Sequence, residues 1–180
     1  FGGRRLFHVD IDVTHPWSRE RRNYITQCIS QLPELRLITF QATVNCDQPE
    51  LKAGQFLPGG RRFSDEEMKE HARLNITWLR KILSGDVQIG IENNNYYPTE
   101  AYETVTDAGF LRSIVEENGI RFLFDIAHAV VTAHNRGITL DDYIKGLPMT
   151  SCIQLHLCQP QIRSDGLAID AHDVPEGEVL

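Results

Sequence analysis

The chain has 180 residues, of which 41% are hydrophobic and 24% are charged, and its formal net charge is −7. This length can bury one sizeable core, and no run approaches the roughly 18 apolar residues of a membrane helix. The acidic total argues against nucleic acid as the main partner, because phosphate binding favours a basic surface.

The ends and the cysteines predict the compartment. No signal-like segment precedes the first strand, and the start at Phe1-Gly2-Gly3 without a Met predicts a fragment or a processed chain. No two cysteines form a C-x-x-C pair, so free thiols in a reducing cytoplasm are favoured over disulfides or a zinc knuckle. The four cysteines are Cys28, Cys46, Cys152 and Cys158.

The first predicted element is a strand over Leu6 to Asp12, where apolar and polar residues alternate. His8, Asp10 and Asp12 share its polar face. Pro33 ends the helix that follows. Pro58-Gly59-Gly60 is the clearest signal against regular secondary structure in the next long loop. In order, the first half contains a helix over 18–32, a strand over 35–42, a loop over 43–63 and, after a capping-box signal at 64–67, a helix to about residue 83.

The second half continues the alternation of strands and helices. Gly119 occupies the position that commonly ends a helix, and Pro148 closes a short helix. The predicted elements are a strand over 87–92, a helix over 107–118, a strand over 120–125, a short helix over 141–146, a strand over 151–157 and a short candidate strand over 167–170.

This alternation predicts an α/β fold with parallel strands and right-handed crossovers. Doubly wound sheets and (β/α)₈ TIM barrels both satisfy it. No G-x-G-x-x-G segment opens a helix, and polar residues stand at many successive strand ends, which favours the barrel. A full barrel takes about 250 residues. We therefore expect one partial TIM-barrel domain over residues 1–180.

Acid and histidine residues mark the ends of successive predicted strands. Each has an ordinary alternative: Asp125 and His128 could be a surface pair, and His156 could be a core histidine. Their conjunction favours a site for two or three divalent ions, because carboxylates and imidazoles from several strand tips would converge. The predicted ligands are Glu92, Asp125, His128, His156, Asp170, His172 and His8, with Glu92, His128 and Asp170 as catalytic residues and Glu92 as the bridging carboxylate.

The predicted substrate contacts lie around the same strand ends. Gln41 ends the second strand, Asn94 follows Glu92, and Arg61 belongs to the loop over 43–63. Long loops on barrels are commonly functional, so this loop is the expected lid over the substrate. A solvated basic loop at Arg61 and Arg62 is the alternative.

Four segments together resemble the xylose-isomerase-like TIM-barrel superfamily. They are Glu92-Asn93, the run from Phe122 to His128, the strand from Ile153 to Leu157, and Asp170-Ala171-His172-Asp173. The stretch from Phe110 to Asp173 most resembles the multinuclear non-heme iron-dependent oxidative enzymes of the methanobactin-biosynthesis type. It carries Ala133-His134-Asn135-Arg136-Gly137 and Leu147-Pro148 in family order.

The resemblance implies two or three iron ions that oxidise a cysteine-containing peptide, which a partner protein presents in many members. It also implies that a further carboxylate ligand comes from a later strand. Ala127 and His128 stand where the iron oxidases usually have two asparagines, and Gln41 stands where a histidine is expected. Asp125-x-x-His128 and Asp170-x-His172 also resemble endonuclease IV, which binds zinc.

The sequence thus predicts a metal-dependent enzyme, with an oxidoreductase favoured over a hydrolase or isomerase. The metal is iron or zinc, with manganese as a further candidate. The substrate is a small molecule or a peptide, and neither nucleic acid nor a membrane is an expected partner. The alternatives are a zinc phosphodiesterase, a sugar or sugar-phosphate isomerase or epimerase, and a non-catalytic barrel that serves as a binding partner.

Overall fold

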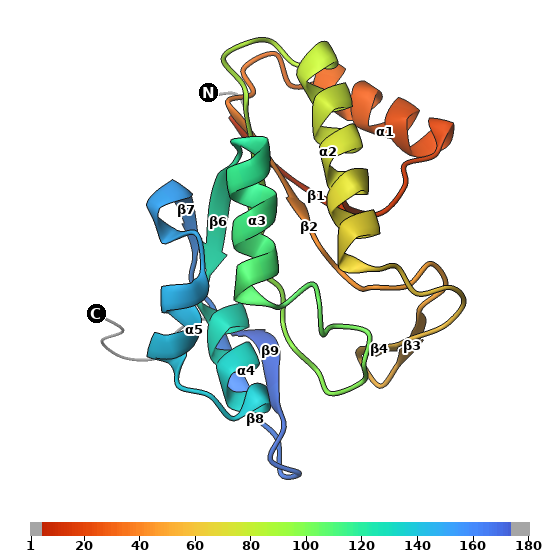
Figure 1. Ribbon diagram of the computed structural model, residues 1–180. Helices are drawn as coiled ribbons and strands as arrows, with labels where there is room; N and C mark the ends of the chain where they lie inside the picture. Colours follow the sequence, from red (N-terminus) through yellow and green to blue (C-terminus); the bar gives the residue numbers. More distant parts are fainter. Residues whose placement is uncertain (1–4, 174–180) are drawn as a thin grey trace.

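The computed structural model describes residues 5–173, excluding the side chains of residues 172 and 173. Strands and helices alternate along the chain as predicted (Figure 1). The elements are β1 (Leu6–Asp12), α1 (Arg19–Ser30), β2 (Leu37–Gln41), β3 (Glu50–Lys52), β4 (Gln55–Leu57), α2 (Asp65–Ile82), β5 (Gln88–Glu92), α3 (Ala108–Asn118), β6 (Arg121–Asp125), α4 (Ile126–Arg136), α5 (Leu140–Gly146), the 3-10 turn η1 (Met149–Ser151), β7 (Cys152–His156), β8 (Gln159–Ile162) and β9 (Ala168–Asp173).

The main sheet has five parallel strands in the order β1-β2-β5-β6-β7, so each strand lies beside the next large strand along the chain. A doubly wound sheet would reverse direction at its first strand, whereas a barrel adds strands in one direction. The fold is a TIM barrel that does not close within the described residues. This confirms the predicted fold class.

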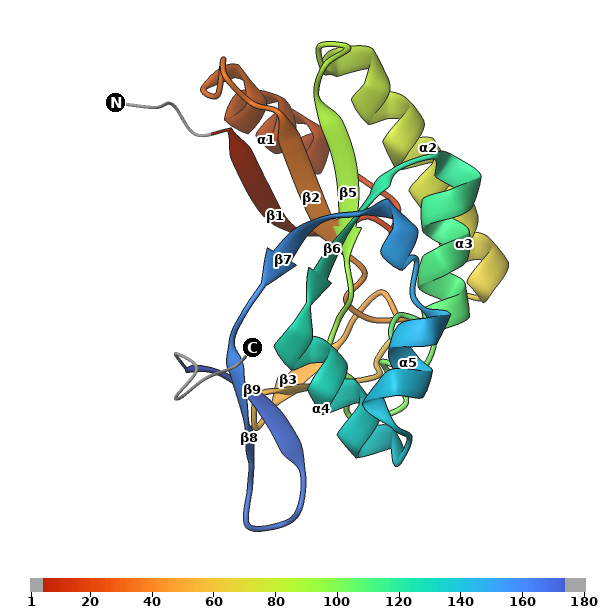
Figure 2. The same ribbon diagram turned by 90° about the vertical axis from the view of Figure 1, so that its left-hand side faces the viewer.

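The helices cover one face of this sheet. Figure 2 shows α2, α3 and α5 side by side against it. Ile38 and Phe40 of β2 and Ile91 of β5 are completely buried on the helix side, and they belong to one continuous core. Because side chains alternate along a strand, the intervening Thr39, Gln41 and Glu92 point to the opposite, inner face. The polar strand tips and the apolar core are thus two faces of the same strands.

The helix signals in the sequence are confirmed. The Ser64 hydroxyl accepts from the Glu67 backbone and the Glu67 carboxylate accepts from the Ser64 backbone, which completes the capping box of α2. Gly119 ends α3 at a φ of 55°, a conformation that favours glycine. No helix among residues 5–173 combines the length and apolar character that crossing a bilayer requires.

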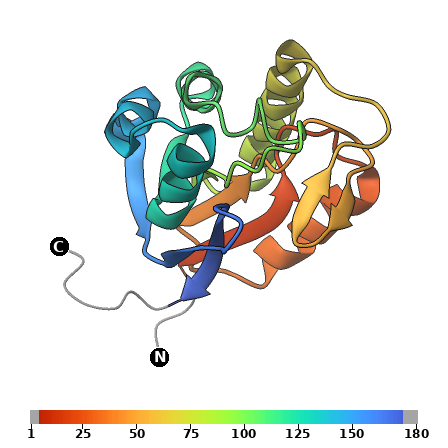
Figure 3. The same cartoon turned by 90° about the horizontal axis from the view of Figure 1, so that it is seen from below.

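Two hairpins differ from the sequence prediction. The loop over 43–63 contains the antiparallel pair β3–β4. The candidate sixth strand is longer than expected and does not join the parallel sheet, since β9 pairs antiparallel with β8. Figure 3, viewed toward the carboxyl ends of the strands, shows both hairpins at this end of the sheet. The local pattern predicted extended chain but could not identify its partner.

The helix α4 was also missed. The sequence after Asp125 suggested a strand turning into a loop, but α4 begins at Ile126 without an intervening loop. Its amphipathic pattern is comparable to that of the predicted helix α3, so α4 was detectable from the sequence and was missed. This correction changes the position of His128, which lies in the first helical turn.

Candidate metal centre

The strand register places the two central carboxylates close together. Glu92 is the last residue of β5 and Asp125 the last of β6, and these strands are neighbours in the sheet. Both side chains are about 2–4% exposed. Asn93 fixes their relation, since its buried amide both donates to the Asp125 carbonyl (2.9 Å) and accepts from the Asp125 N–H (2.8 Å). A side chain thus continues the strand pairing beyond the end of β5.

The two carboxylate oxygens of Asp125 make different contacts, because β6 leads directly into α4. Its Oδ1 is the N-cap acceptor of α4 and receives the His128 backbone N–H at 2.9 Å. Its Oδ2 lies 3.9 Å from His128 Nε2 and 3.7 Å from His156 Nδ1. The cap therefore orients the second carboxylate oxygen toward both imidazoles.

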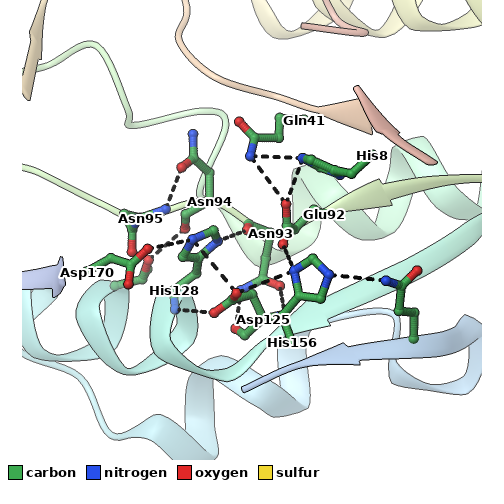
Figure 4. A network of polar contacts seen from close by, with 12 residues as sticks. His8, Gln41, Glu92, Asn93, Asn94, Asn95, Asp125, His128, His156 and Asp170 are labelled. Carbon is green, nitrogen blue, oxygen red and sulfur yellow. Dashed lines mark hydrogen bonds and ion pairs between the residues drawn. The ribbon is translucent and has the colours of Figure 1, made fainter. Parts of the chain in front are cut away.

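Three histidines each hold one ring nitrogen outside the cluster and direct the other into it (Figure 4). His128 donates from Nδ1 to the Asn93 carbonyl at 2.7 Å, while its Nε2 faces the carboxylates. His156 has Nδ1 2.8 Å from Glu92 Oε1, and Gln154 holds its Nε2 at 3.1 Å. His8 has Nδ1 2.9 Å from Thr39 Oγ1 and Nε2 3.3 Å from Glu92 Oε2. Metal-binding histidines are oriented in this way.

Both oxygens of Glu92 are engaged on opposite sides. Oε1 faces His156, while Oε2 meets His8 and the Gln41 amide, whose Nε2 donates at 3.3 Å. A carboxylate between two imidazoles can bridge two ions. His8 and His156 are partly exposed, at 26% and 34%, so the site opens toward the inner face of the sheet.

Asp170 reaches the cluster from the β8–β9 hairpin. Its Oδ2 lies 3.2 Å from His128 Nε2, and its side chain is 5% exposed. Asp170 and His172, which were predicted together, both lie on β9. The predicted role of the His172 side chain falls outside the described part of the chain.

Burial and neighbouring charges shift the pKa values of the side chains in the cluster. Burial acts to raise the pKa of Glu92, but the hydrogen bond from His156 and the nearby charges of His128 and His8 outweigh it, so this pKa is lowered. Burial raises the pKa of Asp125. Burial opposes the charged form of His128, yet the hydrogen bond to Asp170 and the charges of Asp125 and Glu92 raise its pKa to about 9.

His156 and Cys158 respond to the same carboxylates. The hydrogen bond with Glu92 is the main cause that raises the pKa of His156. Burial and then the charges of Asp125, Asp170 and Glu92 raise the pKa of the Cys158 thiol. In the metal-free cluster, His128 is therefore protonated at neutral pH beside the carboxylates, and the Cys158 thiol stays protonated as well.

The predicted substrate contacts are divided by the structure. Gln41 lies inside the cluster, 3.2 Å from His8 Nε2. Asn94 is buried, and its amide donates to the carbonyls of Ala42 and Thr43. Arg61 pairs with Glu67 at the start of α2. Asn94 and Arg61 therefore have structural partners of their own, and only Gln41 of the three lies among the predicted ligands.

Asp12 shares the polar face of β1 with His8, but its carboxylate organises loops. It accepts from the Thr14 N–H at 2.7 Å and from the Thr43 N–H at 2.6 Å. These bonds join the ends of β1 and β2. From the sequence, His8 and not Asp12 is predicted as a ligand, and a bulge between Val9 and Asp12 shifts the register of β1 between these two residues.

Several residues of the site were not predicted. Asn93, Gln154 and Tyr97 support Asp125, His156 and Asp170 respectively, and a backbone hydrogen bond joins the Tyr97 hydroxyl to Asp170. Asn93 was detectable in principle, since a polar residue directly after an apolar strand commonly has a specific partner. Gln154 offered a weaker signal as a polar residue on the inward side of β7.

The donor set fits a divalent ion. Ligand atoms of Glu92, Asp125 and His128 all lie within 4.8 Å of one another, and all three residues are buried. Among the described residues, the ion pairs of Glu92 and Asp125 are with histidines and none is with Lys or Arg. Carboxylate and imidazole ligands suit iron, manganese and zinc. Asp170, His156 and His8 surround this core and could complete a second position.

The chain matches the family model described as RiPP precursor modification enzyme MbnB/TglH/ChrH over residues 48–178. It is 31% identical over 94 residues to the UPF0276 protein RB0508 of Rhizobium meliloti, covering 50% of this chain and 30% of that protein. It is 26% identical over 127 residues to the UPF0276 protein VP3015 of Vibrio parahaemolyticus, covering 65% and 43%. The matched stretches thus span less than half of these relatives.

The fold has a counterpart among solved structures. The 3-keto-D-glucoside 4-epimerase YcjR of E. coli superposes with a TM-score of 0.52, covering 85% of this chain and 57% of that one. Their sequences are 15% identical, so this likeness concerns the fold alone. It agrees with the incomplete barrel seen in the strand order.

Proposed function

Because the chain belongs to the RiPP precursor modification enzyme family MbnB/TglH/ChrH, we propose that it is the metal-binding part of an enzyme that oxidises a cysteine-containing peptide. The observation that carries the proposal is the orientation of His8, His128 and His156: His8 presents one nitrogen to Glu92, His128 presents one to Asp125 and Asp170, and His156 presents one to both Glu92 and Asp125. That orientation is what a polynuclear site requires.

Glu92, Asp125 and His128 would hold one ion. Glu92, His156 and His8 would share a second ion, with Asp170 and His172 as further ligands. Two or three iron ions would supply one-electron redox chemistry toward O₂, and zinc would supply Lewis acidity. The chain contributes the geometry: Asn93 fixes the spacing of the two strand tips, and Gln154 fixes the ring of His156.

The substrate would approach from the inner face of the sheet, where His8 and His156 are partly exposed. A peptide carrying a cysteine is the proposed substrate, and a partner protein that presents this peptide is part of the same proposal. Gln41 lies between the buried Glu92 and the partly exposed His8, where it could contact a bound substrate.

A second candidate function rests on His128. A histidine follows Asp125 by three residues, as in the zinc pattern of endonuclease IV, and its Nε2 faces Asp170. This favours a zinc-dependent phosphodiesterase or a sugar or sugar-phosphate isomerase or epimerase as the alternative. The net charge of −7 disfavours DNA as the substrate of such an enzyme.

The test uses the full-length protein purified without O₂, with its metals measured by mass spectrometry. Bound iron together with O₂ uptake that depends on a cysteine-containing peptide would support the oxidase, and Glu92→Gln should abolish both. Glu116→Gln, an exposed glutamate on α3, is the matched control. Tightly bound zinc without iron would favour the second candidate, and a metal-free protein would leave only a binding role.

A further inference from the structure

The last turn of α4 contacts two segments beside the candidate metal centre, the β8–β9 hairpin and the residues that follow β5. His134 donates from Nε2 to the Gly166 carbonyl at 2.9 Å, at the turn of the β8–β9 hairpin. Asn135 pairs with Ala168 in both directions: Nδ2 donates to the carbonyl at 2.9 Å and Oδ1 accepts from the N–H at 2.9 Å. The side chain of Asn135 thus pairs with the backbone of β9 as a neighbouring strand would.

Asn135 also binds the segment that follows Glu92. Its Nδ2 donates to the Tyr96 carbonyl at 2.8 Å. Thr132 accepts from the Tyr96 N–H and donates to the Asn94 carbonyl, both at 3.0 Å. His128, Thr132 and Asn135 are four and three residues apart, so they form one stripe along the helix. This stripe binds the backbone of Asn93, Asn94 and Tyr96.

Asn135 and Asp170 are linked through two regular elements, the helix α4 and the strand β9. Seven residues separate His128 from Asn135, which is about two turns or roughly 10 Å of helix. On β9, Ala168 and Asp170 are two residues apart and share a face. When Asn135 fixes Ala168 against the end of α4, Asp170 comes to lie over the start of the helix, where its carboxylate meets His128 at 3.2 Å.

The main sheet does not hold the hairpin in this position. The hairpin pairs with no strand of the main sheet, and β8 and β9 pair only with each other. From this geometry we infer that Asn135 is a positioning residue for the metal centre: it holds the β8–β9 hairpin so that Asp170 can share an ion with His128. The inference rests on the proposed metal site, and it assigns a role to the Ala133–Gly137 segment that the ligands leave unexplained.

The first test measures hydrogen exchange in the metal-free, full-length protein. Asn135→Ala removes all three bonds of the side chain, and exchange over residues 159–171 should become at least about tenfold faster while residues 121–128 stay protected. Asn118→Ala is the matched control, since Asn118 is the last residue of α3 and its amide donates only within that helix, to the Ile114 carbonyl. Unchanged exchange in the hairpin would overturn the inference even if the protein proves to bind no metal.

The second test measures Co(II) affinity by its visible absorption. Asn135→Ala should weaken binding by about 10–100-fold, as for other residues that orient ligands. Combining it with Asp170→Asn should cost no more than Asp170→Asn alone, because both changes remove the same ligand. Wild-type affinity in Asn135→Ala, or effects of the two changes that simply add, would overturn the positioning role.

If Asn135→Ala fails to fold, Asn135→Asp replaces it in both measurements. This variant keeps the acceptor for the Ala168 N–H and loses the donor to Ala168 and Tyr96. Its added negative charge would by itself favour cation binding, so weaker Co(II) binding would be clear support. Absence of Co(II) binding in the wild type would reject the proposed metal site, and hydrogen exchange alone would then decide the role of Asn135.

Discussion

Substitutions of Asp125 can separate its role in folding from its role in metal binding, because its two carboxylate oxygens have different partners. Oδ1 caps α4 through the His128 N–H, and Oδ2 faces the imidazoles of His128 and His156. Asparagine is as good an N-cap as aspartate, whereas alanine loses the cap and leaves a buried N–H without its acceptor. Asp125→Asn and Asp125→Ala both remove the charge, so their difference measures the cap.

The loss of a cap costs about 1 kcal/mol, and up to about 2 kcal/mol at a buried helix end. We expect Asp125→Ala to be less stable than Asp125→Asn by about 1–2 kcal/mol, measured by urea unfolding at pH 7 with a chelator present. Both variants should lose at least about tenfold in Co(II) affinity, because both lack the ligand. Asp141→Asn, an exposed aspartate in the first turn of α5, controls for loss of a charge near a helix start.

The two variants could contradict this reasoning in either measurement. Equal stability would show that the cap contributes nothing, so the strand–helix junction would not depend on Oδ1. Wild-type Co(II) affinity in Asp125→Asn would show that Oδ2 is not a ligand.

Four further predictions concern three residues. The pKa of His128 is raised to about 9, above the ordinary value of about 6.5. The protonated imidazole therefore stabilises the metal-free protein fully below pH 6.5, and this contribution is lost as the pH rises through 9. The variant His128→Gln should remove this pH dependence from the midpoints of urea unfolding, and an unchanged pH dependence would reject the assignment. The same proton competes with metal, so Co(II) affinity should increase between pH 7 and 9, whereas a flat profile would mean that His128 is no ligand. Ser64→Ala should cost about 1 kcal/mol by breaking the capping box, without any change in Co(II) affinity. Asp12→Ala should cost about 2 kcal/mol or more by leaving the Thr14 and Thr43 N–H groups without acceptors, and a cost below about 0.5 kcal/mol would contradict its structural role.

The sequence predicted most of the strands and helices because the signals for these elements are local. Alternation on β1, the capping box at Ser64 and the glycine at 119 each act within a few residues. The convergence of Glu92, Asp125, His128 and His156 followed from one further rule, that neighbouring parallel strands end at the same edge. Asp170 was also included, although its strand belongs to a hairpin and not to the barrel sheet.

What the sequence could not show depends on contacts between distant segments. The polar residues His128, Thr132 and Asn135 of α4 bind the backbone of residues that follow β5, and only the fold brings these two segments together. Asn94 and Asn93 are neighbours with the same side chain, yet Asn93 joins the strand tips of the site while Asn94 holds a loop beyond it. Such assignments require the position of the partner backbone, which lies 32 and 52 residues away in the chain.

The central claim is that the carboxyl ends of these strands form a polynuclear metal site, and counting metal ions in the full-length protein tests it most directly. We predict two or three divalent ions per chain after anaerobic purification, with both Glu92→Gln and Asp125→Asn reducing that number and Asp141→Asn leaving it unchanged. A wild-type protein that retains no more metal than Glu92→Gln would contradict the claim.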